Sequence, residues 1–403
     1  MTTAAGTRGT NLPAVGGFNQ NVILSLIRRT PGGISRAELA RSSGLASQTV
    51  SNAVSRLIEE GLVEDGDSYV HGRGKPRILV RLRPDARHAV GVNFDLESTA
   101  FIVLDLAGSV VARRLVRRLP ITPPATLMRA IADGVDDIIG RAGVDRSRVL
   151  GIGLGTPGPI DSQLGRLLGH PMLPGWDNEP IRDTVAALTG LPVVMEKATN
   201  AAPAAHLWLH PEVRDFAFVY YAAGIGTGLV LNGQLHRGVS GNAGEGGTIV
   251  VPADGLPAAR PSEYLGHLVA PRYLLEQAEA EGLHLTAGTE DGRFTELLDE
   301  YGRGSPVAVT VMERAGRILG RAMSTLVNLL DVGDLVFGGP RWTDVAAIFL
   351  PLIAEELANA PQRQYPHTVN LMSASVGDEV AAFGAACLVL ESALTIDPAA
   401  LLI

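Results

Sequence analysis

The chain has 403 residues, 46% hydrophobic and 19% charged, with a formal net charge of −8. This composition excludes disorder over most of the length, and no apolar stretch is long enough to span a membrane. A single cysteine, Cys387, excludes a disulfide framework and a cysteine-built zinc site. The length suggests two or three domains. Because residues 1–10 contain no apolar leader segment, we expect a soluble, cytoplasmic protein.

The charge is unevenly distributed along the chain. Residues 1–85 carry eleven basic and seven acidic residues and so a charge of +4, which leaves −12 for the remainder. A small basic segment attached to a large acidic one favours a polyanion as the partner of the basic segment. A chance fluctuation is the alternative, since +4 is modest.

The basic segment has the pattern of a helix-turn-helix. Residues Asn19–Arg29 have helical spacing and are followed by a proline and two glycines. Ser35 and Glu38 have the spacing of a capping box, which predicts a short helix that ends near Gly44. We expect Ser47 to cap a second, longer helix, Gln48–Glu60. Two short helices joined by a glycine-bearing turn and preceded by a third are typical of this DNA-binding motif.

The second helix of the pair carries side chains suited to DNA contact. Its polar face consists of Ser47, Gln48, Thr49, Ser51, Asn52, Ser55 and Arg56. Such side chains donate to and accept from base edges and phosphates. An ordinary solvated face is the alternative, but such faces are more often rich in Glu and Lys. We therefore predict that this helix reads double-stranded DNA.

A wing is predicted after the second helix. Residues 72–76 form a glycine-rich tip that carries Arg73 and Lys75, and residues 77–82 have strand character. A slim basic tip of this kind can enter an A·T-rich minor groove, whose negative potential attracts Arg and Lys. A merely solvated hairpin tip is the alternative.

From Val90 onward the pattern alternates between strands and helices, which predicts two α/β lobes. We expect a DNA-binding domain at 1–85, a first lobe at 86–200 and a second lobe at 201–403, with a C-terminal helix that is able to pack back on the first lobe. Two glycine-rich stretches follow strands and are candidates for phosphate contact: Gly224, Gly226, Thr227 and Gly228 in the first, Gly338 and Gly339 in the second. Each is weak alone, because the same residues also suit a tight hairpin.

Taken together, these motifs resemble the ROK family of repressors and sugar kinases, in its winged-helix transcription-factor branch. The resemblance runs from about residue 19 to 394 and is carried by Ile34–Ala40, Gly44–Ser51, Leu57–Glu64, Gly151–Asp161, Gly224–Leu229 and Leu319–Gly339. It implies a two-lobed, actin-like kinase fold for the body. It further implies a sugar between the lobes and nucleotide phosphates on the glycine loops.

Three departures from the family pattern argue against a working kinase. Ala198 stands where the family has the aspartate that deprotonates the sugar, and a methyl group accepts no proton. The first phosphate turn is here Asn93–Leu96, without glycine. Thr248 replaces the histidine ligand of the family's zinc site, and Pro252–Ser262 contains no cysteine, so no metal and no cofactor are expected.

The resemblance leaves part of the family's sugar site in place: Gly158, Asn200, Glu245 and Glu263. A carboxylate can accept from sugar hydroxyls without catalysis, so these residues predict a retained sugar or sugar-derivative site. The alternative is that both glutamates are structural relics in a collapsed cleft.

We therefore expect a DNA-binding repressor of carbohydrate-related genes that senses a sugar. The alternatives are a ligand-independent regulator and an ATP-dependent sugar kinase, against which Ala198 speaks. Because one helix-turn-helix buries a small interface, we expect a homodimer or dimer of dimers on a palindromic operator. Residues Val311–Leu330 and Glu379–Leu394 are candidate dimer helices, and both equally suit an internal core.

Overall fold

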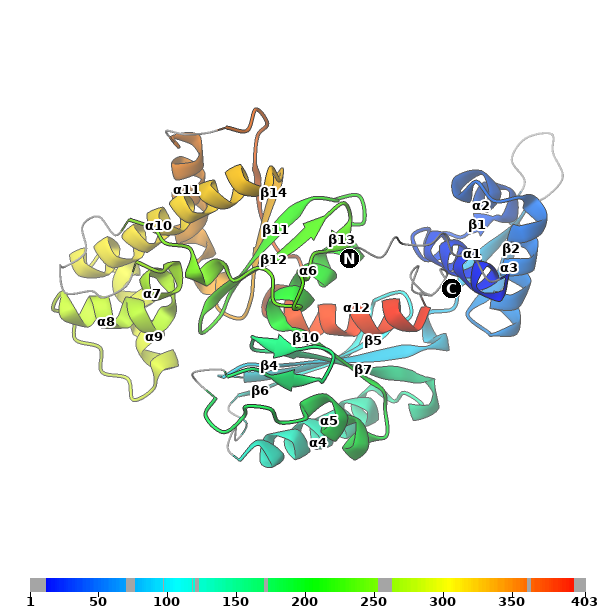
Figure 1. Cartoon of the computed structure of the whole chain (residues 1–403), viewed down its shortest axis with the longest axis horizontal. Helices are drawn as coiled ribbons and strands as arrows, with labels where there is room; N and C mark the ends of the chain where they lie inside the picture. Colours follow the sequence, from blue (N-terminus) through cyan, green and yellow to red (C-terminus); the bar gives the residue numbers. More distant parts are fainter. Residues whose placement is uncertain are drawn as a thin grey trace, which may run out of the picture.

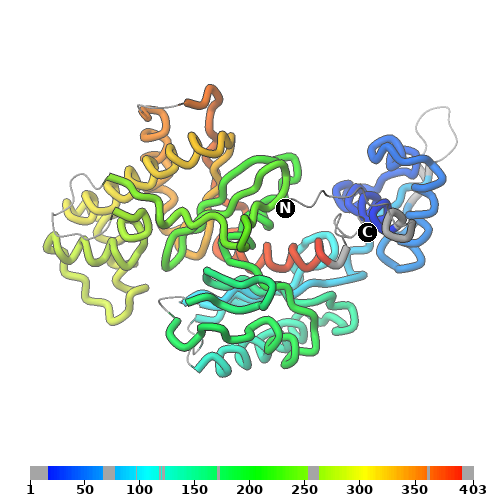
Figure 2. Tube along the Cα trace, viewed as in Figure 1, coloured from blue at the N-terminus to red at the C-terminus, as the bar shows by residue number. Residues whose placement is uncertain are grey.

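The computed structural model describes residues 12–69, 77–96, 98–117, 119, 123–169, 173–252, 263–360 and 364–394. It contains a small head and a two-lobed α/β body (Figure 1), which confirms the predicted fold class. Figure 2 follows the same chain as a tube from the head through the first lobe to the second. Within the described ranges, no helix is long and apolar enough to cross a membrane.

The head, residues 12–83, is a winged helix. Its elements are α1 (Leu12–Arg28), β1 (Ile34–Ser35), α2 (Arg36–Ser43), α3 (Ser47–Glu59), β2 (Val63–Tyr69) and β3 (Arg77–Leu82). The three strands form an antiparallel sheet in the order β1-β3-β2. The capping box is confirmed, because the Ser35 hydroxyl accepts from the Glu38 amide and the Glu38 carboxylate accepts from the Ser35 amide. Gly44 ends α2 with a φ of 70°.

Two predicted helix starts are wrong. Helix α1 begins at Leu12 rather than Asn19, and Pro13 falls in its first turn, where a missing N–H removes no helical hydrogen bond. Ser47 does not cap α3; Ala46 holds the cap position and its carbonyl already accepts from the Val50 amide. The helix therefore starts one residue earlier, and Ser47 is its first residue.

The first lobe is built on a mixed five-stranded sheet in the order β10-β7-β4-β5-β6. Its strands and helices are η1 (Pro84–Ala86), β4 (His88–Phe94), β5 (Ser98–Asp105), β6 (Val110–Arg117), α4 (Pro124–Ala142), η2 (Arg146–Arg148), β7 (Val149–Thr156), β8 (Ile160–Asp161), β9 (Arg166–Leu167), α5 (Ile181–Thr189) and β10 (Val193–Lys197). Strands β4, β7 and β10 run parallel. Helices α4 and α5 cover one face of the sheet, seen below it in Figure 1.

The second lobe holds another five-stranded sheet, in the order β13-β12-β11-β14-β15. Its elements are α6 (Ala198–Leu209), β11 (Phe216–Tyr221), β12 (Ile225–Leu231), β13 (Gln234–Leu235), η3 (Gly246–Thr248), α7 (Leu265–Val269), α8 (Pro271–Ala280), α9 (Glu290–Gly302), α10 (Pro306–Leu330), β14 (Asp334–Gly338), α11 (Trp342–Ala358) and β15 (Asn370–Ser373). Strand β11 is buried throughout: Phe216 and Phe218 join the core around α6, whereas Ala217 and Val219 join the core around α10. Both faces of this sheet are therefore covered.

The last helix, α12 (Val380–Leu394, after η4, Gly377–Glu379), packs on β4 and β7 of the first lobe and on α6. A Cβ atom added to Gly91 would lie 1.9 Å from the Ala382 carbonyl oxygen, so this packing is possible only because the strand presents a glycine there. Residues 380–390 are all buried, and α10 is buried along one side. Both predicted dimer helices are thus core helices of this chain.

The head touches the body at one end of α6 and α12. One hydrophobic cluster runs from Ile23 and Ile27 of α1 to Leu390 of α12. The guanidinium of Arg28 lies over the ring of Trp208, 3.7 Å from its centre. Figure 1 shows α12 reaching from the body toward α1. Helix α6 thus has one end between the lobes and the other beneath the head.

Candidate DNA-reading helix and ligand cavity

Helix α3 presents a polar face to solvent and an apolar face to the head core. Val50, Val54 and Leu57 are buried, whereas Gln48 and Asn52 are exposed. Ser47, Ser55 and Arg56 are also exposed, and Thr49 and Ser51 are half-buried. The amide of Gln48 donates to Oδ1 of Asn52 over 3.0 Å, so the two side chains lie side by side one turn apart. This is the surface that a recognition helix offers to a major groove.

The hairpin behind α3 is the wing. Strands β2 and β3 pair in antiparallel register from Val63↔Leu82 onward, with an irregularity between Asp65 and Ser68. Arg73 and Lys75 lie outside the described residues, so their contact with DNA stays a prediction.

A cavity of about 190 Å³ lies between the two lobes. We call it the interlobe cavity; its wall includes Phe94, Asp95, Gly158, Lys197, Ala198, Tyr220, Gly224, Gly226 and Glu245. The first-lobe residues follow β4, β7 and β10, the parallel strands of that sheet, at their carboxyl ends. In open α/β sheets this is the edge at which ligands bind.

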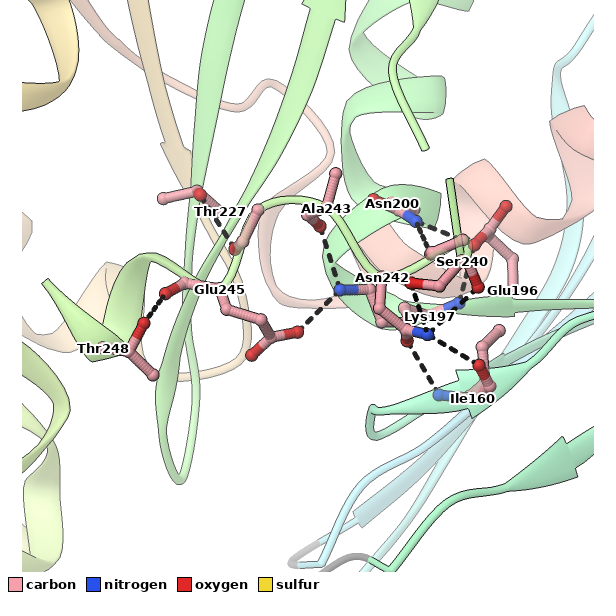
Figure 3. A network of polar contacts seen from close by, with 12 residues as sticks. Ile160, Glu196, Lys197, Asn200, Thr227, Ser240, Asn242, Ala243, Glu245 and Thr248 are labelled. Carbon is pink, nitrogen blue, oxygen red and sulfur yellow. Dashed lines mark hydrogen bonds and ion pairs between the residues drawn. The ribbon is translucent and has the colours of Figure 1, made fainter. Parts of the chain in front are cut away.

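A partly buried ion pair joins the two lobes at this cavity. The Lys197 ammonium donates to Oε1 of Glu245 over 2.7 Å and to the Ala243 carbonyl over 3.0 Å (Figure 3). The Lys197 side chain is 2% exposed, whereas that of Glu245 is 56% exposed. Gly158 makes room for the pair, because a Cβ there would lie 2.6 Å from Cδ of Lys197. Oε1 of Glu245 is thereby fixed by a positive charge.

The loop that carries Glu245 is held on both sides. Asn242 exchanges two 2.8 Å hydrogen bonds with the backbone of Ile160 in the first lobe. Thr248 donates its hydroxyl to the Glu245 carbonyl, and Thr227 donates to the Gly244 carbonyl (Figure 3). The hydroxyl of Thr248 thus fastens the loop.

The four predicted sugar residues are not all at the cavity wall. Gly158 and Glu245 lie there together. Asn200 is fully buried behind the wall, where it donates to the Glu196 carboxylate and to the Gly241 carbonyl. Glu263 is exposed at the edge of residues 253–262, which lie outside the described ranges. The structure therefore brings two of the four to the cavity, and Asn200 supports the loop from behind.

The hydroxyl of Tyr220 also belongs to this wall and was missed by the sequence reasoning. It accepts from the Asn93 amide over 3.3 Å. Burial, more than the nearby Asp95, raises the pKa of Tyr220 well above its usual value, so the hydroxyl stays protonated. Lys197 was likewise given no role, although its place beside Ala198 in the family segment was a usable signal.

Packing accounts for most of the predicted glycine loops. Strands β11 and β12 form a tight antiparallel hairpin, and a Cβ on Gly228 would lie 2.0 Å from the Thr199 carbonyl oxygen of α6. Thr227 is buried. Gly338 packs against Phe218, and Gly339, with a φ of 114°, against the backbone of Tyr221. Phosphate contact at these loops stays a prediction. The alternative, a tight hairpin, is the arrangement that β11 and β12 adopt.

Metal-ligand side chains do not gather in the described part of the chain. No group of three or more His, Cys, Asp or Glu residues is placed to hold an ion there. The rings of His206 and His210 lie against each other in a tilted arrangement, with ring centres 4.6 Å apart, at the end of α6.

Comparison with known proteins assigns both parts of the chain. The model of the ROK family matches residues 89–392, and the model of winged helix-turn-helix DNA-binding domains matches residues 20–64. A xylose repressor from Caldicellulosiruptor bescii is 29% identical over 217 residues, about half of each chain (53% and 54%).

Two solved structures are similar in fold. One is a ROK family transcriptional regulator described as a homologue of the E. coli MLC protein, with a TM-score of 0.77 and 21% identity over 94% of this chain and 97% of that one. The other is a ROK family glucokinase from Streptomyces griseus in complex with glucose and AMPPNP. It has a TM-score of 0.61 and 25% identity over 75% of this chain and 98% of that one.

Proposed function

This chain belongs to the ROK family, and from that premise we propose that it represses genes of carbohydrate use and releases or binds DNA in response to a sugar or sugar derivative. Its winged helix makes it a DNA-binding transcriptional regulator of the family. The observation that carries the proposal is the exposed polar face of α3, with Gln48 and Asn52 side by side over an apolar core. The xylose repressor among the relatives supports the sugar as effector class.

The interlobe cavity supports a polyhydroxyl ligand. Oε1 of Glu245 is fixed by Lys197, while Oε2 has no hydrogen-bond partner among the described residues and remains available to a ligand hydroxyl. The Lys197 ammonium has three hydrogens, of which two are used. A sugar that bridges the two lobes here would change the angle between them and, through α6, the position of the head.

Phosphotransfer is not part of this proposal. The side chain of Ala198 at the cavity wall is a methyl group, which accepts no proton. General-base catalysis contributes roughly 10²–10⁴ in rate, so its loss alone makes a kinase poor. Phe94 further fills the first turn, stacked on Trp176 with ring centres 5.7 Å apart.

We also propose that the protein acts as a homodimer or dimer of dimers on a palindromic operator. A single winged helix contacts one half-site, and two-fold symmetry in the protein is mirrored in the DNA. Since α12 and one side of α10 are buried within the chain, we expect the contact between subunits to use exposed surfaces of the body.

The test begins with selection of bound sequences from random double-stranded DNA by the full chain. We expect a palindromic site, and light scattering should give at least two chains per complex. Sugars and sugar acids are then titrated by calorimetry into the wild type, Glu245→Gln and the control Glu276→Gln, whose carboxylate pairs with Arg272 far from the cavity. A ligand bound by wild type and control, but at least tenfold more weakly by Glu245→Gln, supports the proposal. A non-palindromic site bound by one chain contradicts it.

The rival function, a ligand-independent regulator, has one observation in its favour. Lys197 already holds Glu245, so part of the cavity is occupied by the protein's own side chains. Calorimetry separates the two functions: if no sugar in the panel binds and none shifts DNA affinity, the body serves oligomerisation and the rival is correct.

A further inference from the structure

A second cavity lies where the head meets the body. Its volume is about 410 Å³. We call it the head–body cavity; its wall includes Arg28 at the end of α1, Arg29 just after it, Trp208 from α6, Arg214, Gln234, and Glu391 from α12. Arg28 and Arg214 are far apart in the sequence and meet only because α1 packs against the body (Figure 1). The cavity therefore exists only while the head is docked.

Three arginines face this space without a carboxylate partner. In the described part of the chain, Arg28, Arg29 and Arg214 form no ion pair with an acid. Most other arginines of the body do, for example Arg314 with Glu281 at 2.8 Å and Arg237 with Glu196 at 2.6 Å. Here three arginines that form no such pair with a described residue, from segments far apart in the sequence, line one cavity.

The charges in the cavity are not balanced locally. Glu391 is the one acid on its described wall, against three guanidinium groups. Burial, and then the charge of Arg29, lower the pKa of Arg28 to about 10. The ring of Trp208 covers one face of Arg28 and leaves the edge of its guanidinium to donate. Arg214 donates one N–H to the Asn232 carbonyl over 3.1 Å, and its other N–H groups are left to bind a ligand.

The chemistry of this wall selects its ligand. Arginine presents a planar fork of N–H donors that matches phosphate and carboxylate oxygens in pairs. Three such forks around a small, partly enclosed space fit a compact group with two negative charges better than a neutral one. The side chains of Asn21, Ser25 and Gln234 add neutral polar groups on the same wall.

We propose that the head–body cavity binds the phosphate group of a small metabolite, which bridges Arg28 and Arg29 of the head to Arg214 of the body. Such a ligand fixes the head against the body in one orientation. It is an effector site separate from the interlobe cavity and takes a different class of compound. In a dimer, holding both heads in fixed positions sets the distance between the two recognition helices.

The same arginines could instead contact DNA phosphates, so the experiment has an arm for each source. Inorganic phosphate is titrated into the full chain without DNA, in a low-salt buffer free of other multivalent anions. Binding is followed by calorimetry and by tryptophan fluorescence. Trp208, one of three tryptophans, stacks on Arg28 and reports the site directly.

Arg214→Gln and Arg29→Gln remove one fork each from exposed positions, so both variants should fold; circular dichroism checks this. The matched control is Arg129→Gln, an exposed arginine of α4 that carries the same charge far from the cavity. We expect saturable phosphate binding with a change in fluorescence. Each cavity variant should bind at least about tenfold more weakly, the loss of one charge-assisted interaction, and Arg129→Gln should match the wild type.

Two results would overturn the proposal. The first is phosphate binding that is absent or equally strong in wild type, Arg214→Gln and Arg129→Gln. The second is a wild type that does not bind phosphate while Arg29→Gln and Arg214→Gln lower DNA affinity and flatten its salt dependence. In that case the arginines contact the DNA backbone.

Discussion

The two cavities of this molecule lie at opposite ends of one helix and differ in how their charges are satisfied. At the start of α6, in the interlobe cavity, Lys197 and Glu245 neutralise each other. At its other end, in the head–body cavity, Arg28, Arg29 and Arg214 form no ion pair with a described residue, and Glu391 is the one acid on the described wall. A cavity whose charged side chains pair with each other suits a neutral ligand that hydrogen-bonds to those side chains. A cavity lined by arginines without an ion pair suits an anion. The difference shows how one family fold can offer two ligand chemistries along a single element.

The largest effect is expected from changes in α3 of the head, because neither cavity can regulate transcription unless α3 reads DNA. Gln48→Ala with Asn52→Ala removes two candidate base contacts, each worth about 1–3 kcal/mol of discrimination. Affinity for the selected operator should fall at least about 30-fold, while affinity for random DNA stays the same. Fluorescence anisotropy with both DNAs measures it. Equal loss on both would mean that these residues contact the backbone rather than bases.

The Lys197–Glu245 ion pair is tested by removing each partner in turn, because one is buried and the other is exposed. Glu245→Ala leaves a charged Lys197 in a site where 2% of its side chain is exposed, so unfolding free energy should fall by about 2 kcal/mol. Lys197→Met leaves Glu245, whose side chain is 56% exposed, free to hydrate, and should cost less than about 1 kcal/mol. Urea unfolding followed by circular dichroism compares the two. The reverse order would show that Glu245, not Lys197, is the strained partner.

The helix between the cavities carries a titratable side chain, His206, that should make it sensitive to acid. Burial, and then the neighbouring His210, lower the pKa of His206 to about 4 from 6.5. The unfolded chain therefore takes up a proton below about pH 6.5, the folded chain only near pH 4, and stability is lost as the pH falls between them. From pH 7 to pH 5 this group should account for about 2 kcal/mol of lost stability.

His206→Gln isolates this contribution, since glutamine does not titrate. The stability advantage of the wild type over the variant should shrink as the pH falls from 7 to 5. Urea unfolding at several pH values measures the difference. A constant difference across that range would mean that His206 titrates normally in the folded chain.

Substitutions in the wing should have the smallest effect, which is on the salt dependence of DNA affinity. Arg73→Gln with Lys75→Gln should reduce the slope of log K against log salt by up to about two, one for each lost phosphate contact. Sequence preference on the selected operator should remain. An unchanged slope would place the tip away from DNA.

Features set by neighbouring residues were predictable from the sequence. The Ser35–Glu38 capping box, the left-handed Gly44 and the all-apolar strand Phe216–Tyr221 each depend on residues within a few positions. Helix starts were less so. The start of α3 at Ser47 rather than Gln48 depends on the backbone bond from Val50 to Ala46, against the usual preference of serine for the cap.

In the candidate site, only residues that lie in family motifs could be predicted from the sequence. Glu245 and Gly158 were identified by their motifs, but both contact Lys197, which is 48 residues from Glu245 in the sequence. Asn200 was predicted at the cavity and yet lies behind the wall, where its amide donates to Glu196 and Gly241. The head–body cavity had no local signature at all. Arg28 and Arg214 become neighbours only when α1 docks on the body.

The position of α12 has a consequence for how the chain is made. The final helix completes the core of the first lobe, seated against Gly91 of β4, about 290 residues after that strand is synthesised. On the ribosome the head, whose contacts are local, can fold early, whereas one apolar face of the first-lobe sheet stays uncovered until α12 has been synthesised. A chain released before Val380 would therefore pair a folded winged helix with an unfinished body. We expect such fragments to be aggregation-prone and to depend on chaperones, whatever their affinity for DNA.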